Sequence, residues 1–181
     1  LSESAQRHVA ALRLRDGDAI TLFDGSGDEW GAELLAGRGR ARLTSRRAAD
    51  RESPLALTLL LGLSAGDRMD YAIQKATELG VRQIVPVMTE RSVVRLSAER
   101  ATRRLAHWRG VVLSACEQCG RNRPPELAPL QSFDEAIFAE RTGLKLLLSP
   151  DGDQRLGERE RPDRKSTRLN SSHTDISRMP S

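Results

Sequence analysis

The stretch that decides the fold is L-A-L-T-L-L-L-G-L-S-A-G-D-R-M-D-Y-A-I-Q-K-A-T-E-L-G-V-R-Q-I-V-P-V-M, residues 55–88. It opens on a nearly continuous apolar run, residues 55–63, which is typical of a strand buried on both faces of a sheet. Apolar residues then recur at helical spacing from Met69 to Leu79, and Gly80 is a natural helix end. Residues 81–88 form a second apolar run. The stretch therefore predicts a strand, a helix and a second strand.

The same alternation continues toward the C-terminus. Ser97 is a helix-capping residue, and an apolar stripe that reaches Cys119 predicts a long helix ending at Gly120. We expect a short helix over 132–139 and a third strand over 144–148. Strands that alternate with helices predict a parallel sheet with helices packed on it, which is an α/β fold.

The first fifty residues have a different pattern. Three short runs are expected to be strands: 19–23, 30–35 and 41–45. D-G-S-G-D at 24–28 is typical of a hairpin turn. Short strands with tight turns favour a small module of β-barrel type. Residues 46–54 have no apolar period and are expected to be a linker, so the domain boundaries fall at 1–50 and 54–162.

Composition limits the class of protein. The chain has 181 residues, of which 38% are hydrophobic and 30% charged, as is typical of a soluble globular protein. No apolar run has membrane-spanning length and no signal peptide is recognisable, so we expect a cytoplasmic protein without a membrane partner. The net charge is +4, and only three of the 29 basic residues are lysines. Codon bias is the simpler explanation for this arginine excess, which also allows a nucleic-acid partner.

Both cysteines lie in A-C-E-Q-C-G-R-N-R-P-P-E, residues 115–126. A structural zinc site needs four ligands, and the three histidines of the chain are not at ligand spacing. A redox C-x-x-C usually begins a helix, whereas Cys116 and Cys119 end the predicted one. The favoured interpretation is two small, partly buried side chains and no metal.

Four further stretches accompany residues 115–126: R-H-V-A-A-L-R-L-R-D-G-D (7–18), T-L-F-D-G-S-G-D-E-W (21–30), A-I-Q-K-A-T-E-L-G-V (72–81) and T-E-R-S-V-V (89–94). Together, and in this order, they resemble the bacterial 16S rRNA uracil-N3 methyltransferase family, also called the RsmE family. The resemblance implies a PUA-like β-barrel that helps hold RNA, followed by a SPOUT domain that binds S-adenosylmethionine. It also implies a homodimer that methylates N3 of one uridine in the 16S rRNA of the small ribosomal subunit.

Candidate site residues follow from this resemblance and from the chemistry. Uracil N3 becomes nucleophilic when it loses its proton, and the charge then spreads to the carbonyl oxygens. Arg121 is the candidate to hold that charge, and Glu117 is a second catalytic candidate that would orient it. The candidate RNA contacts are Arg13, Arg91, Gln118 and Arg123. The resemblance places a cofactor loop at Leu148, Ser149 and Pro150. Two alternatives stay open: Glu117 as a surface ion-pair partner of Arg121, and Arg13 as a strand-surface residue.

The sequence departs from the family pattern in two places. Ala65 stands where family members usually carry lysine. The family's later G-P-E-G-G and L-G-x-x-I-L-R segments, which complete the knot, are not found after Pro150. Residues 163–173 instead resemble the translation of a common sequencing adapter, so 163–181 is expected to be a non-native tail. We therefore expect a truncated, inactive copy of the enzyme. The alternatives are a non-catalytic RNA-binding fragment and another SPOUT RNA methyltransferase.

Overall fold

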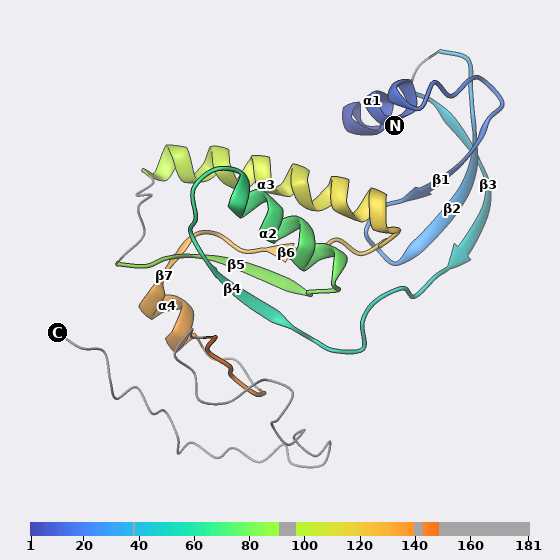
Figure 1. The fold of residues 1–181 in the computed structure, drawn as a ribbon. Coiled ribbons are helices and arrows are strands. Elements are labelled where there is room, and N and C mark those ends of the chain that lie inside the picture. The colour runs from blue at the N-terminus through green and yellow to red at the C-terminus, as the bar shows by residue number, and fades with distance from the viewer. Residues whose placement is uncertain (38, 91–96, 140–142, 149–181) are drawn as a thin grey trace. The chain divides into compact units, whose positions relative to one another are not determined.

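The computed structural model describes residues 1–37, 39–90, 97–139 and 143–148. The chain divides into two units, Leu1–Phe138 and Ala139–Ser181. The first unit contains an antiparallel sheet followed by a parallel sheet with helices (Figure 1). The predicted α/β class, with a small antiparallel module before a parallel sheet, is confirmed.

The N-terminal part of this unit is one helix and a three-stranded sheet. After helix α1 (Glu3–Ala11) come β1 (Ala19–Phe23), β2 (Asp28–Leu34) and β3 (Ala41–Ala48), which pair antiparallel in chain order. The strand predicted over 19–23 has the predicted bounds. Strand β3 continues three residues into the expected linker, because Arg46 and Arg47 still lie in register opposite β2.

Helix α1 was not expected from the sequence. None of its residues is fully buried, and its half-buried positions Ala5 and Val9 form only a short, weakly apolar stripe in the sequence. Its N-terminus nevertheless carries a recognisable cap, because the Ser2 hydroxyl accepts a hydrogen bond from the Ala5 N–H at 3.2 Å.

The second part of the unit is built on a parallel sheet. Its elements are β4 (Thr58–Gly62), α2 (Asp67–Glu78), β5 (Gln83–Met88), α3 (Ala98–Cys119), β6 (Glu126–Leu127), β7 (Gln131–Ser132) and α4 (Phe133–Phe138). Strand β5 is central, with β4 on one side and β6 and β7 on the other. The two long helices and the short helix form where the sequence predicts them, and α3 has the predicted cap at Ser97 and the predicted end at Gly120.

The third strand of this sheet is not where the sequence predicted it. Two short segments, β6 and β7, pair with the start and the end of β5, whereas residues 143–148 carry no strand in the part of the chain that the structure describes. The interruption lies beside Pro86. Ile84 offers its carbonyl to the Ala128 N–H, so the alternate residue Pro86 faces the same side and has no N–H to donate. A continuous third strand would lack a hydrogen bond at this point.

Strand β4 is also less buried than its apolar run suggested. It lies at the edge of the described sheet, and none of residues 58–62 is fully buried. Leu59 and Leu61 pack against the core on one face, whereas Leu60 on the opposite face is 38% exposed. An edge strand with one covered face is thus as apolar in sequence as a central strand.

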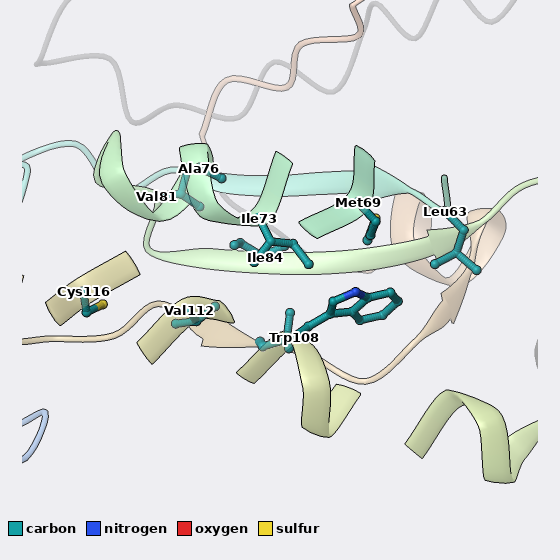
Figure 2. Packing of buried hydrophobic residues seen from close by; sticks show 10 residues of the cluster. Leu63, Met69, Ile73, Ala76, Val81, Ile84, Trp108, Val112 and Cys116 are labelled. Carbon is teal, nitrogen blue, oxygen red and sulfur yellow. The ribbon is translucent and has the colours of Figure 1, made fainter. Parts of the chain in front are cut away.

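The main core lies between β5 and the helices α2 and α3 (Figure 2). Met69 and Ile73 of α2 meet Trp108 and Val112 of α3 over Ile84 of β5, and these five side chains are buried. The alternate residues of β5, including Val85, form a smaller cluster with Ala136 of α4. Strand β5 is therefore buried on both faces, as its apolar run predicted.

The helices α2 and α3 are also joined by a polar contact. Asp70 of α2 accepts a hydrogen bond from the Trp108 Nε1–H at 3.1 Å and lies 2.7 Å from Nε2 of His107. The contact with Asp70 satisfies the indole N–H of the buried Trp108.

Within the described ranges, no helix is long and apolar enough to cross a membrane.

Candidate functional site

The candidate site predicted from residues 115–126 forms where α3 ends. Gly120 adopts a left-handed conformation with φ of 77°, and its N–H bonds to the Cys116 carbonyl at 2.9 Å. The chain then turns through residues 121–125 into β6. Because β6 pairs with the first residues of β5, this loop lies at the amino-terminal ends of the parallel strands.

Arg121 is buried and its guanidinium is held by protein groups. Its Nε donates to Glu52 at 3.2 Å, and its Nη2 forms a close ion pair with the same carboxylate. Its Nη1 donates to the carbonyl oxygens of Thr77 at 2.7 Å and Val81 at 3.1 Å. The planar fork therefore joins the segment before β4 to the end of α2. The catalytic role of Arg121 stays a prediction, and in this geometry the side chain performs a structural one.

Asn122 is the next residue and is 1% exposed. Its amide nitrogen donates to the carbonyl oxygens of Gly27 at 3.0 Å and Ala49 at 2.6 Å. Both partners belong to the N-terminal part of the unit, at the β1–β2 hairpin and just after β3. Sequence reasoning did not single out Asn122. No local signal marks it, because its partners lie 95 and 73 residues away in sequence and only the fold brings them together.

The remaining candidates near this loop are exposed. Glu117 lies 3.9 Å from the ring of His8 in α1, a separation at which an ion pair is weak. The open alternative of a Glu117–Arg121 pair is not what the structure shows, since Arg121 pairs with Glu52. Gln118 and Arg123 are exposed, and the Arg123 side chain lies against Gly27.

The other predicted site residues lie elsewhere. Arg13 is exposed and has a left-handed backbone with φ of 56°, in the turn after α1 and not on a strand. Leu148 is 81% exposed and belongs to the second unit. Arg91, Ser149 and Pro150 lie outside the described residues. The structure therefore brings together Glu117, Gln118, Arg121 and Arg123, at the end of α3 and in the loop that follows it.

The two cysteines differ in environment. Cys116 is fully buried, and burial raises the pKa of its thiol to about 11, although the Arg121 cation opposes the shift. Cys119 is exposed, and both thiols are free. Across the part of the chain that the structure describes, no cluster of three or more histidine, cysteine or acidic side chains could hold a metal ion.

A shallow pocket of about 320 Å³ lies beside the loop. Its walls come from the segment before β4, the end of α2 and the end of α3, and its charged side chains are Arg51, Glu52, Glu78 and Arg121. Two cations and two anions leave no net charge, so the pocket does not favour a polyanion.

Strand β3 carries three arginines, Arg42, Arg46 and Arg47, and Arg51 follows shortly after it. Arg46 pairs with Asp28, and Arg47 and Arg51 pair with Glu29. The hydrogen bond from Arg47, together with the charge of Arg51, holds the pKa of Glu29 below its usual value, against the effect of burial. Arg46, Arg47 and Arg51 are thus partly neutralised, although the side chains of Arg46 and Arg47, like that of Arg42, are exposed. Because these side chains are exposed, they remain accessible to a partner.

Comparison with known proteins places the chain in a class of enzymes that modify RNA. Residues 51–171 match the RNA methyltransferase domain and residues 1–44 match the RNA methyltransferase PUA domain. The chain therefore belongs to the RNA methyltransferase family. The PUA match covers α1 and most of the antiparallel sheet, and the methyltransferase match begins at Arg51, just after β3. Because that match extends to residue 171, the domain end placed at 162 stays a prediction.

The relatives confirm the resemblance seen in the sequence. The chain is 36% identical over 132 residues to ribosomal RNA small subunit methyltransferase E of Synechocystis, covering 70% of this chain and 42% of the relative. It is 29% identical over 138 residues to the enzyme of that name from Bacillus subtilis, covering 75% and 54%. The chain thus spans about half the length of these curated relatives.

Solved structures agree with this assignment. Ribosomal RNA small subunit methyltransferase E from Neisseria gonorrhoeae, bound to S-adenosylmethionine, superposes with a TM-score of 0.82 at 42% identity. The match covers 90% of this chain and 69% of that one. A putative methyltransferase from Legionella pneumophila, also bound to S-adenosylmethionine, gives a TM-score of 0.79 at 37% identity over 83% and 64% of the two chains.

Proposed function

We propose that the protein transfers a methyl group from S-adenosylmethionine to N3 of a uridine in 16S rRNA. The observation that carries this proposal is that both parts of the chain, in order, match the two domains of RNA methyltransferases. The name of the curated relatives supports the small-subunit rRNA as substrate. The cofactor of the two solved relatives supports the methyl donor.

The chemistry limits what the protein must supply. The cofactor, when bound, provides a methyl group that is already electrophilic, so the protein has to align that group with N3, accept the N3 proton and hold charge on the uracil oxygens. Of the predicted cofactor loop, the structure describes only Leu148. We therefore assign no step to the cofactor geometry and keep the roles of Leu148, Ser149 and Pro150 as predictions.

Among the described residues, several exposed polar side chains could contact RNA. Arg13, Gln118 and Arg42 are exposed, and Arg42 lies on the edge strand β3. Arginine can contact phosphate oxygens through two N–H groups at once, which suits a folded RNA backbone. We include Arg13, Gln118 and Arg123 in the proposed RNA contacts, with Arg42 as an addition that the sequence did not indicate.

Assembly and location belong to the same proposal. The family resemblance implies a homodimer with a shared active site, and a substrate in the small ribosomal subunit implies a cytoplasmic location. The homodimer expectation concerns the full-length protein and is tested on it by light scattering coupled to size-exclusion chromatography. A full-length monomer at micromolar concentration would contradict it.

The test of the function uses the product of the complete gene, read from source DNA across codon 162. The enzyme is incubated with radiolabelled S-adenosylmethionine and unmodified small subunits, and the RNA is then copied by reverse transcriptase. A methyl group on N3 blocks Watson–Crick pairing, so we expect one strong stop at one uridine. RNA binding without label would indicate a non-catalytic RNA-binding protein, and label in tRNA would indicate a different methyltransferase.

The 181-residue chain requires a separate measurement. The sequence predicts that this chain binds S-adenosylmethionine no better than background, and titration calorimetry checks this directly. Micromolar binding would contradict the prediction and would show that the cofactor pocket does not need further residues.

A further inference from the structure

We propose that residues 120–124, here called the latch loop, fix the orientation of the N-terminal sheet relative to the parallel sheet. Asn122 and Arg121 are then positioning residues that hold the RNA-binding groups of the two parts in register. The orientation itself is independent of the proposed function, whereas its effect on RNA binding rests on that function.

The first argument is the bonding of Asn122. It is buried, and its amide nitrogen donates to Gly27 and Ala49, which are 95 and 73 residues away in sequence. The Gly27 carbonyl also accepts a hydrogen bond from the Ala49 N–H at 3.3 Å, so the three groups form one junction. The Oδ1 atom of Asn122 is buried without a partner in the described structure. Burying the unpaired Oδ1 costs free energy, so the two hydrogen bonds donated by the amide nitrogen must offset that cost.

The second argument is that side chains of the latch loop pack against the backbone of the β1–β2 hairpin. Gly27 has φ of 98°, and a Cβ atom at this position would collide with the Arg123 guanidinium. A Cβ atom on Gly25 would lie 3.4 Å from Pro124. The hairpin D-G-S-G-D therefore needs its glycines for their left-handed backbone, and the Arg123 and Pro124 side chains lie against them.

The third argument is that the latch loop is also hydrogen-bonded to the methyltransferase part, through Arg121. Arg121 binds Glu52 and the carbonyl oxygens of Thr77 and Val81, so adjacent residues hold opposite sides of the junction. Pro125, directly after the loop, is buried and restricts the backbone. Phe23 of β1 packs against the main core, which adds apolar contact between the two parts.

The consequence for RNA follows from preorganisation. Two binding surfaces on one rigid body act at a high effective concentration, whereas two loosely joined surfaces do not. The latch loop would keep Arg13 and Arg42 of the N-terminal part at a fixed distance from the methyltransferase domain. No contact between the latch loop and RNA is required for this effect.

The experiment measures orientation directly. Spin labels are placed at Leu43→Cys on β3 and Ser114→Cys on α3, both exposed positions, with Cys119→Ser in the background. Asn122→Asp has the same shape but replaces the donor with an acceptor that faces two carbonyl oxygens. We expect a single narrow distance distribution in the parent protein and a broad one in the variant.

A reference pair makes the outcome decisive. Labels at Tyr71→Cys on α2 and Ser114→Cys on α3 lie within the methyltransferase part, and we expect their distance distribution to stay narrow in Asn122→Asp. An unchanged cross-domain distribution would overturn the proposal. Equal broadening of both pairs would overturn it too, because Asn122 would then stabilise the whole fold and not an orientation.

RNA binding supplies the second readout. We expect Asn122→Asp to raise the Kd for a small-subunit rRNA transcript about tenfold. The dependence of the Kd on salt concentration should not change, because no phosphate contact is removed. A shallower salt dependence would overturn the positioning role, since Asn122 or its loop would then contact phosphates. If the product of the complete gene binds no RNA, the proposed function fails, and the distance measurement still tests whether Asn122 fixes the orientation.

Discussion

Arg121 joins Glu52 to the end of α2 through one buried guanidinium. Arg121→Ala would leave the carboxylate without its partner and would leave the Thr77 and Val81 carbonyl oxygens without their donor. We expect a loss of about 2–4 kcal/mol in the free energy of unfolding, measured by urea denaturation.

The matched control for this residue is Arg103→Ala, which removes an exposed ion pair with Glu99 on α3. It should leave stability unchanged within error. If Arg121→Ala behaves like the control and yet abolishes methyl transfer by the complete enzyme, the catalytic prediction for Arg121 gains support over the structural role.

The cysteines give a second prediction at the scale of single residues. The thiolate is the reactive form, and burial raises the pKa of Cys116 to about 11. Raising the pKa lowers the thiolate fraction at any given pH, so Cys116 should resist iodoacetamide at pH 8 while the exposed Cys119 reacts. Mass spectrometry of peptides from native and urea-treated protein checks this. Equal labelling of both cysteines in the native protein would contradict the burial of Cys116.

The same shift fixes the sign of a pH effect on stability. The pKa of Cys116 is higher in the folded state than its ordinary value of 9.0. Its contribution to stability is therefore fully present below pH 9 and is lost as the pH rises through about 11.

At the scale of elements, one glycine lies within helix α3 and a second glycine caps its C-terminus, and the two have opposite effects on stability. Gly110 lies within the helix with open space around its Cα, whereas Gly120 ends the helix at φ of 77°. Gly110→Ala should raise the free energy of unfolding by about 0.5–1 kcal/mol, because alanine loses less backbone entropy in a helix.

Gly120→Ala should instead lower stability by about 1–2 kcal/mol, since an alanine with a left-handed backbone is strained. Thermal unfolding of the two variants checks both signs in one experiment. A stabilising effect of alanine at both positions would mean that α3 does not end in a left-handed residue.

Some boundaries of the helices and strands could be predicted from nearby residues, and others could not. The caps of α3 at Ser97 and Gly120 and the bounds of β1 could be predicted because each depends on neighbouring residues. Helix α1 could not, since it buries no residue fully and its apolar stripe is short. The split third strand could not either, because it depends on Pro86 in a strand that is distant in sequence.

The candidate site illustrates the same limit. Sequence reasoning predicted that residues 115–126 matter, and the structure places them at a junction. The partners of Arg121 and Asn122, which are Glu52, Thr77 and Gly27, are brought there by tertiary structure. Two of these partners lie in the very stretches, 21–30 and 72–81, that carry the family resemblance. A resemblance in separate stretches can thus reflect one shared packing contact as readily as a set of substrate contacts.

At the scale of the whole molecule, the N-terminal part lacks a large core of its own. Its buried hydrophobic residues are Ala32 and Leu34, and Phe23 packs on the core of the other part. A module with so little buried apolar area should not be stable alone. We therefore expect the N-terminal part and the methyltransferase part of the first unit to unfold in one cooperative transition.

The two tryptophans allow this to be measured, because Trp30 lies in β2 and Trp108 in α3. In Trp108→Phe, fluorescence reports on the N-terminal sheet through Trp30, while far-ultraviolet circular dichroism reports mainly on α2 and α3. The two urea transitions should coincide in this protein. With Asn122→Asp added, the Trp30 transition should move to lower urea than the helical one, because the sheet then loses its attachment before the main core does. An early Trp30 transition without that substitution would show that the two parts are independent and that the junction contributes little to the fold.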